Sequence, residues 1–198
     1  MTGRERIRRA VLFQGPDRVP RALPDPWGSD FFDVGTDSDP NWKPGTPGED
    51  EWGCVWEKDP EGKTMGQVTF HPLGDYSMLD NFSFPDYTLP ARYEKTREAM
   101  QNNKEEKFVL ANIPLSLIHR LEYLRGHVEA WTDPYEYPEE LGRLLDKFAD
   151  TAIESIEKFS EIGVDGIISC DDWGLQDRPM VSPDVFRDFF QPRYEKVY

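Results

Sequence analysis

The clearest hydrophobic pattern in the chain lies between residues 138 and 162, where apolar residues recur at intervals of three and one. That spacing gathers their side chains on one face of a helix. Pro138 stands at the start of the stripe and Gly163 follows its end, the usual order of these residues at the two ends of a helix. The pattern predicts one long amphipathic helix over residues 138–162.

Two short runs, 107–113 and 166–170, are mainly apolar. Such runs are typical of strands buried within a sheet. Helices are expected at 91–103, at 115–125 and from Ser182 onward, where the serine can cap the first turn. Buried strands that alternate with amphipathic helices predict an α/β fold with a parallel sheet covered by helices.

The first ninety residues are rich in proline and glycine and carry weaker patterns. A helix is expected at 2–14, because Thr2 and Glu5 form a capping-box pattern. The further expectations are a short strand at 19–23, an irregular segment at 24–50, a β-hairpin formed by 53–59 and 66–72, and a loop at 79–87.

The chain is strongly acidic, with a formal net charge of -15 and a pI near 4.6. Such a surface repels phosphate backbones and anionic membranes, so we expect neither nucleic-acid nor membrane binding. No apolar run approaches the ~18 residues of a membrane span, and the basic start is too polar for a signal peptide, which predicts a cytoplasmic protein. The two cysteines, Cys54 and Cys170, predict neither a disulfide scaffold nor a complete zinc site.

The candidate chemistry begins with Asp171 and Asp172, which follow the predicted strand at 166–170. In parallel α/β folds, functional groups gather at the carboxyl ends of the strands. Two carboxylates there can bind a cation, polarise a substrate or act as acid and base, so we expect them to be catalytic. Trp173 and Gln176 are expected to bind substrate. The alternative is structural, with one aspartate capping a turn or helix and the other solvated.

The predicted helix at 115–125 carries a second polar group. His119 with Glu122, or Glu122 with Arg125, could face the same end of the sheet. From the spacing alone, an ordinary ion pair on the helix surface is the favoured interpretation of Glu122 and Arg125.

Other residues of reactive type are interpreted as structural. His71 is expected to be structural or exposed, and Cys170 to be a small core residue within its strand. His127 follows a helix-ending glycine and is expected to interact with that helix end. Trp52 and Trp56 are expected to pack in the core or a loop. No glycine-rich nucleotide motif and no GxSxG motif is present.

Several segments together resemble the uroporphyrinogen decarboxylase superfamily. They are RERIRRAVLFQGPDRVP, DEWGCVW, PLGDYSMLDNFSFPD, EYLRG and, above all, GVDGIISCDDWGLQDRPMVSPDVFRDFFQPRYEKV. The resemblance covers essentially the whole chain. It implies a (β/α)8 TIM barrel with the substrate cleft at the C-terminal pole of the strands. The resemblance also places Glu122 on a helix that lines this cleft, so Glu122 is expected to contact substrate.

The resemblance implies two activities. One is cofactor-free decarboxylation of uroporphyrinogen III in porphyrin biosynthesis, and the other is cobalamin-dependent methyl transfer with a zinc-bound thiol and a corrinoid protein. This chain reads RALPDPWGSDFF where the decarboxylases have an arginine-rich segment that holds substrate carboxylates. Because DEWG and DDWG look like the methyltransferase-like branch, we expect that activity. Decarboxylation, and a non-catalytic half-barrel that binds another chain, are the alternatives.

A closed barrel takes about 250 residues, whereas this chain has 198. We therefore expect a single incomplete domain over 1–198, the N-terminal half of the barrel. Its N-terminal helix, loop and hairpin would lie in 1–90 and its βα units in 91–198. The zinc ligands are expected beyond residue 198, so this chain alone would hold no metal or cofactor. Open strand edges would favour a homo-oligomer.

Overall fold

The computed structural model describes residues 1–64 and 66–198, which form two compact units. The sheet unit comprises Met1–Asp39, Thr88–Pro114 and Glu154–Ser169. The hairpin unit comprises Pro40–Tyr87, Leu115–Ile153 and Cys170–Tyr198. Each unit is built from three separate stretches of sequence. The prediction of a single domain over 1–198 stays a prediction.

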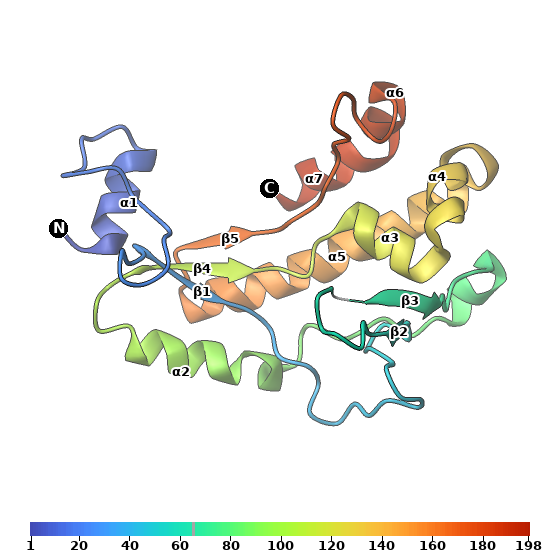
Figure 1. Cartoon of the computed structure of the whole chain (residues 1–198), viewed down its shortest axis with the longest axis horizontal. Helices are drawn as coiled ribbons and strands as arrows, with labels where there is room; N and C mark the ends of the chain where they lie inside the picture. Colours follow the sequence, from blue (N-terminus) through green and yellow to red (C-terminus); the bar gives the residue numbers. More distant parts are fainter. Residues whose placement is uncertain (65) are drawn as a thin grey trace. The chain divides into compact units, whose positions relative to one another are not determined.

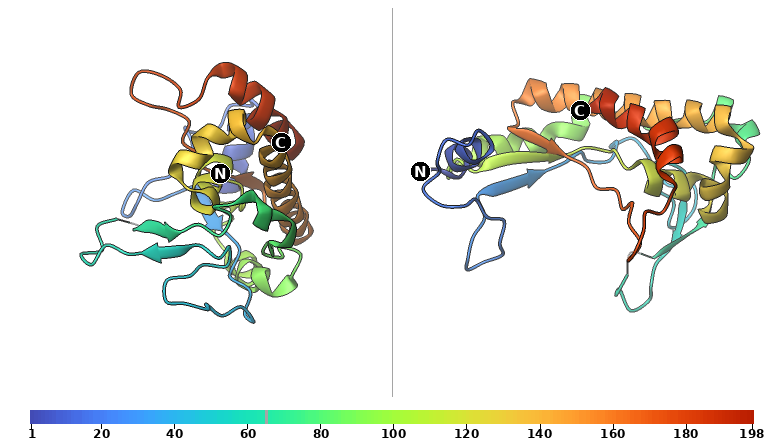
Figure 2. Two further views of the ribbon diagram at one scale, coloured as in Figure 1. Left: turned by 90° about the vertical axis from the view of Figure 1, so that its right-hand side faces the viewer. Right: turned by 90° about the horizontal axis from the view of Figure 1, so that it is seen from above.

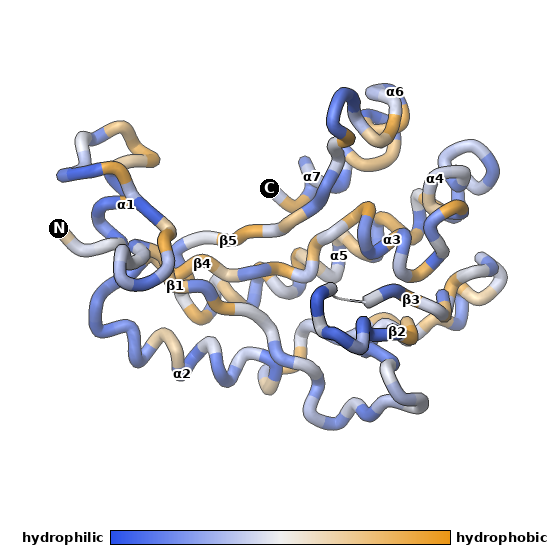
Figure 3. Tube along the Cα trace, viewed as in Figure 1, coloured by the Kyte–Doolittle hydropathy of each residue, from blue (hydrophilic) through white to orange (hydrophobic). Residues whose placement is uncertain are grey.

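The sheet unit is built on three parallel strands in the order β1-β4-β5. These are β1 (Phe31–Val34), β4 (Phe108–Asn112) and β5 (Gly166–Ile168) (Figure 1). Figure 3 shows the apolar character of β5. The strands expected at 107–113 and 166–170 and their parallel pairing are confirmed. Three strands give a mixed α/β unit with a small parallel sheet.

Strand β1 lies where the sequence predicted irregular structure, and the strand expected at 19–23 is wrong. Residues 19–23 include Pro20, which cannot donate to a ladder, and only Ala22 forms an isolated bridge, to Ser29. In β1, Phe31 pairs with Phe108 in the ladder, and their rings meet edge to face at 6.0 Å. Tertiary pairing with β4, rather than the local pattern, defines this strand.

Helices cover one side of the sheet. Figure 2 shows α2 (Glu94–Asn102) and the last turns of α5 (Pro138–Ile162) on the same side of the three strands. A short 3-10 helix, Pro90–Tyr93, leads into α2, and Tyr93 packs edge to face on Phe159 of α5 at 5.1 Å. The helices expected at 91–103 and 138–162 are confirmed.

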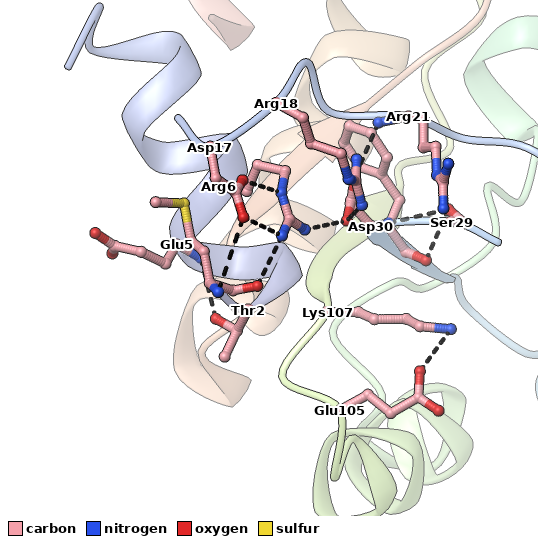
Figure 4. Close-up of polar contacts among 12 residues, drawn as sticks. Thr2, Glu5, Arg6, Asp17, Arg18, Arg21, Ser29, Asp30, Glu105 and Lys107 are labelled. Atoms are coloured by element: carbon pink, nitrogen blue, oxygen red, sulfur yellow. Dashed lines mark hydrogen bonds and ion pairs between the residues drawn. The ribbon is translucent and has the colours of Figure 1, made fainter. Parts of the chain in front are cut away.

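The N-terminal helix is fixed by a cluster of charges around Asp30 (Figure 4). Helix α1 (Gly3–Val11) has the expected cap, with the Glu5 amide donating to the Thr2 hydroxyl. Its buried Arg6 donates to Asp17 and to Asp30, each at 2.6 Å. Arg18 donates to both Asp30 oxygens at 2.7 and 2.8 Å. A carboxylate with this many charged donors forms strong hydrogen bonds.

The hairpin unit contains the antiparallel pair β2 (Val55–Glu57) and β3 (Gln67–Phe70), which confirms the expected hairpin. Asp50 organises the chain before it, accepting from the Trp52 and Cys54 amides at 2.9 and 3.0 Å and from the Trp56 indole at 2.8 Å. Trp52 is buried against three aromatic rings, and this confirms core packing for it. The loop expected at 79–87 begins within a 3-10 helix, Tyr76–Asn81.

Helix α3 (Leu117–Arg125) is confirmed, but it is followed by a helix that the sequence did not predict, α4 (His127–Glu136). Gly126 joins them at a φ of 112°, a conformation that suits glycine. The sequence did not predict α4 because it contains Pro134, and proline disfavours a helix interior. Pro134 lies in the last turn of α4, where it leaves the Ala130 carbonyl without its usual amide donor from within the helix.

A buried ion pair ties α3 to α4. Arg125 donates to both oxygens of Asp133 at 2.8 Å, and the two side chains are 3% and 0% exposed. Tyr76 also donates to Asp133 at 2.7 Å, and the guanidinium lies 3.8 Å from the centre of the Tyr76 ring. Arg125 further donates to the Leu73 carbonyl. The pair thus fixes the turn between the two helices and the chain that follows β3.

The C-terminal segment is helical, as expected from Ser182 onward. The Ser182 hydroxyl accepts from the Val185 amide at 3.2 Å, which confirms the cap. The helix begins as α6 (Pro183–Val185), widens into a π-helical turn at Phe186–Phe190 and continues as α7 (Gln191–Val197). Within the described part of the chain, no helix combines the length and apolar character needed to cross a bilayer.

Replacing Asp30 with asparagine should destabilise the protein by roughly 2 kcal/mol, because Arg6 and Arg18 lose a charged acceptor. Burial alone would raise the pKa of Asp30, but hydrogen bonds from Arg18, the Arg21 amide and Arg6 outweigh it and hold the pKa at about 2. The hydrogen bond from Arg6 likewise lowers the pKa of Asp17 to about 2.

These lowered pKa values also predict a pH dependence. The ordinary pKa of an aspartate is 3.8, whereas Asp30 and Asp17 have lower values in the folded protein. The stabilisation from their ionised carboxylates is therefore complete above about pH 4 and is lost as the pH falls toward 2. Urea midpoints measured from pH 6 to pH 2 should fall less steeply for Asp30→Asn than for the unmodified protein. Equal slopes would contradict the assignment.

Replacing Asp133 with alanine should cost about 3–5 kcal/mol, since it leaves a buried guanidinium without its carboxylate. Asp146→Ala is the matched control, because Asp146 is half exposed and pairs with Arg193 near the surface. That change should cost less than about 1 kcal/mol. Urea unfolding of both variants checks this, and equal losses of stability would rule out a dominant role for the buried pair.

Candidate active site

Asp171 is the best-connected carboxylate of the predicted site. It follows β5 in the chain, its side chain is 5% exposed, and one oxygen accepts from the Ser116 hydroxyl at 2.8 Å. The other accepts from the Leu117 amide at 2.7 Å and from the Tyr194 hydroxyl. Leu117 opens α3, so Asp171 caps that helix from 54 residues away in the sequence.

His119 stands beside this carboxylate and is the accessible titratable group of the cluster. Its Nδ1 lies 3.2 Å from the Ser116 hydroxyl and 3.7 Å from an Asp171 oxygen, and its side chain is 35% exposed. The ring stacks on Tyr123 at a centroid distance of 6.3 Å. A histidine held by hydrogen-bonded neighbours and open to solvent can exchange protons with a bound molecule.

Tyr194 closes the cluster from the C-terminal helix. Burial, together with its hydrogen bond to Asp171, raises the pKa of its hydroxyl well above the usual value. The hydroxyl therefore stays a neutral donor, and it also accepts from the Trp173 indole at 3.0 Å. Trp173 packs against Phe186 and Phe190, with ring centroids 5.2 and 4.6 Å away.

The two predicted catalytic aspartates differ sharply in environment. Asp172 is exposed, and it accepts from the Gly174 amide at 3.1 Å in a local turn. Gln176 is exposed as well. This geometry matches the structural alternative, in which one aspartate caps a helix and the other is solvated. The catalytic role of the pair and the substrate-binding role of Trp173 and Gln176 stay predictions.

Glu122 lines a cavity of about 400 Å³ in the hairpin unit. Its walls come from the β2–β3 hairpin and from the region where α3 meets α4. Tyr123 belongs both to this cavity and to the stacked pair with His119, so cavity and cluster share a side chain. The residues that line the cavity are Trp56, Gly66, Gln67, Val68, His71, Glu122, Tyr123 and His127.

The structure corrects the predicted partners of Glu122. Arg125 is buried and pairs with Asp133, so the expected Glu122–Arg125 surface pair is wrong. Glu122 instead lies 2.8 Å from Nδ1 of His127. His127 opens α4 and contacts the last turn of α3 through Glu122, as expected from its position after the helix-ending glycine. The sequence did not predict α4, whose Asp133 takes Arg125 away from Glu122.

His71 and Cys54 join the hairpin to the end of α3. Both contact the Tyr123 carbonyl, from His71 Nδ1 at 2.8 Å and from the Cys54 thiol at 3.3 Å. This carbonyl is one of the last four of α3, which have no partner within the helix. The structural role expected for His71 is confirmed.

The cysteines do not form a reactive or metal-binding site in the described residues. Burial, aided by nearby Asp50, raises the pKa of the Cys54 thiol to about 12. Cys170 is exposed rather than a core residue, because β5 ends at Ile168 and the prediction carried that strand too far. Among the residues that the structure describes, no group of three His, Cys, Asp or Glu could hold a metal ion.

Sequence reasoning missed two members of the cluster. Ser116 stands directly before α3 in the position of a helix cap, so its residue type was a signal. Its hydroxyl serves Asp171 instead of the helix. Tyr194 lies 23 residues from Asp171, and the local pattern around it gave no indication of the contact.

Comparison with known proteins identifies the family. The family model described as Uroporphyrinogen decarboxylase (URO-D) matches residues 70–198, which include the Asp171 cluster and half of the residues that line the cavity, namely His71, Glu122, Tyr123 and His127. No curated protein matches the chain. Because the matched region covers more than half of the sequence, the chain belongs to the uroporphyrinogen decarboxylase (URO-D) family.

Proposed function

We propose that this chain is part of a (β/α)8-barrel enzyme of the URO-D family that takes part in corrinoid-dependent methyl transfer rather than in uroporphyrinogen decarboxylation. The observation that carries the proposal is the state of the arginines. All six arginines of the hairpin unit lie within 4 Å of an aspartate oxygen. The pairs are Arg120–Asp50, Arg125–Asp133, Arg143–Asp80, Arg178–Asp177, Arg187–Asp184 and Arg193–Asp146.

Arg120 and Arg125 of α3 matter most for substrate binding, because Glu122 and Tyr123 between them line the cavity. Arg125 is 3% exposed and saturated by Asp133. Arg120 lies 4.4 Å above the Trp52 ring and 3.9 Å from Asp50. A substrate with eight carboxylates needs several cations that can turn toward it. Neither side chain is placed to serve as one.

The DEWG and DDWG segments add support through their resemblance to the methyltransferase-like branch. The first builds the loop around Asp50 that leads into the hairpin. The second carries the cap of α3 and the Trp173 ring against the C-terminal helix. Both segments thus hold parts of the candidate site in place. Relatives with the same cleft would need the same support, which would explain why they share these segments.

In this proposal the residues of the chain hold the substrate and move protons. Glu122 contacts the substrate in the cavity. His119 exchanges a proton with a bound molecule, and Asp171 is a positioning residue that fixes the Ser116 hydroxyl beside the imidazole. Tyr194 donates to Asp171 and keeps that carboxylate satisfied.

The resemblance also implies zinc and a corrinoid protein. The described residues do not fit zinc, because they offer no group of three ligands and the Cys54 thiol, with its raised pKa, is a poor thiolate donor. A corrinoid supplies a transferable methyl group when it is bound, and in this proposal a partner protein would deliver it.

The complete gene product that contains this chain should demethylate methylcobalamin in the presence of a thiol. The reaction is measured as the loss of the absorption that comes from the cobalt–carbon bond. The gene product should release no carbon dioxide from uroporphyrinogen III. Turnover of the tetrapyrrole alone would overturn the proposal in favour of decarboxylation. Absence of both activities in a folded protein would favour a binding or scaffold role.

Asp171→Asn should destabilise the protein by about 1–3 kcal/mol. The carboxylate accepts from the Ser116 hydroxyl, the Leu117 amide and the Tyr194 hydroxyl, and the NH2 group of asparagine cannot accept from the donor that it would face. In the same gene product, kcat/KM should fall and its pH profile should change, since the Ser116–His119 arrangement is lost. Asp172→Asn is the matched control and should change stability by less than about 0.5 kcal/mol. Loss of stability in Asp171→Asn with an unchanged pH profile would reduce Asp171 to a helix cap.

A further inference from the structure

We propose that the cavity of the hairpin unit binds a small organic cation with an aromatic or apolar body, such as an arylalkyl amine. The inference rests on the proposed function only in taking this cavity as the substrate site. The ligand class follows from the residues that line the cavity. Its volume of about 400 Å³ falls in the range of small-molecule sites.

The cavity offers aromatic surface to a flat ligand. The rings of Trp56 and Tyr123 meet at 4.8 Å and an interplanar angle of 69°, so they present two walls at an angle. The donor of the Trp56 indole is already bound by Asp50 at 2.8 Å. Trp56 therefore contributes its ring face, which attracts apolar groups and cations.

The histidines of the cavity contribute acceptors when they are neutral. The Tyr123 carbonyl can only accept, so the contact at 2.8 Å places the proton of His71 on Nδ1. The Glu122 carboxylate also accepts, so the contact at 2.8 Å places a proton on Nδ1 of His127. In each neutral ring Nε2 is then left as a lone-pair acceptor.

Among the described residues of the lining, Glu122 provides the only formal charge while the histidines are neutral. Its side chain is 18% exposed, and no lysine or arginine belongs to the described residues that line the cavity. Its second oxygen remains for a ligand donor. A half-enclosed carboxylate beside ring faces and acceptor nitrogens favours a donor that carries positive charge. The same lining disfavours carboxylates and phosphates.

Three probes with the same ring system test the inference at pH 8. Tryptamine carries a positive charge, tryptophol is its neutral alcohol, and indole-3-acetate is an anion. Each probe is titrated into the full chain, and binding is measured by calorimetry and by NMR of the Trp56 indole. Tryptamine should bind with a Kd about tenfold below that of tryptophol. Indole-3-acetate should bind more weakly than either.

Variants separate the charge from the ring. Glu122→Gln should raise the Kd of tryptamine about tenfold and leave that of tryptophol within about twofold, since the amide keeps the shape but not the charge. Glu136→Gln is the matched control, because Glu136 is exposed in α4 outside the cavity lining. It should change neither value. Trp56→Leu should weaken both probes by a similar factor.

The outcomes distinguish this inference from the proposed function. Tighter or equal binding of indole-3-acetate, no preference for tryptamine, or no binding of any probe at millimolar concentration would overturn the ligand class. Binding is read without turnover, so a failed methyl-transfer assay leaves these results intact. The preference within the unmodified protein decides the matter even if a variant does not fold.

Discussion

The hairpin unit depends on one buried interaction, the pair between Arg125 and Asp133. Both charges are removed from water, so the pair is stable only because Tyr76 and the Leu73 carbonyl satisfy the remaining hydrogen-bonding groups. This requirement fixes three segments at once: the end of α3, the length of α4 and the chain after β3. All three segments contribute to the cavity walls, through Glu122 and Tyr123 of α3, His127 of α4 and His71 after β3. Its shape is therefore set by a contact that does not line it.

Asp171 combines two roles that sequence reasoning treats as alternatives. It caps α3, which is a structural task, and it orients the Ser116 hydroxyl next to His119, which is what a catalytic histidine needs. A residue with both roles is hard to test by loss of activity alone, because folding and chemistry change together. The contrast with exposed Asp172 supplies the reference that separates them.

Hydrophobic periodicity predicted the elements whose burial is set by their own sequence, namely α5, β4 and β5. It failed for β1 and α4, whose formation depends on pairing with β4 and on the Asp133 contact. At the candidate site, composition pointed to Asp171 and Glu122, but their partners come from distant segments. Residue type can suggest which group is reactive. The fold decides which donor or acceptor it meets.

The way the last carbonyls of α3 are satisfied has a consequence for the order of folding. The Tyr123 and Leu124 carbonyls take their partners from Cys54, His71 and Leu73, between 51 and 69 residues away in the chain. The end of α3 can form these hydrogen bonds only after the chain between it and the donors has closed into a loop. Closing such a long loop is entropically costly and slows folding. Helix α5, with its continuous apolar stripe, can form early, whereas α3 is completed only when the hairpin docks.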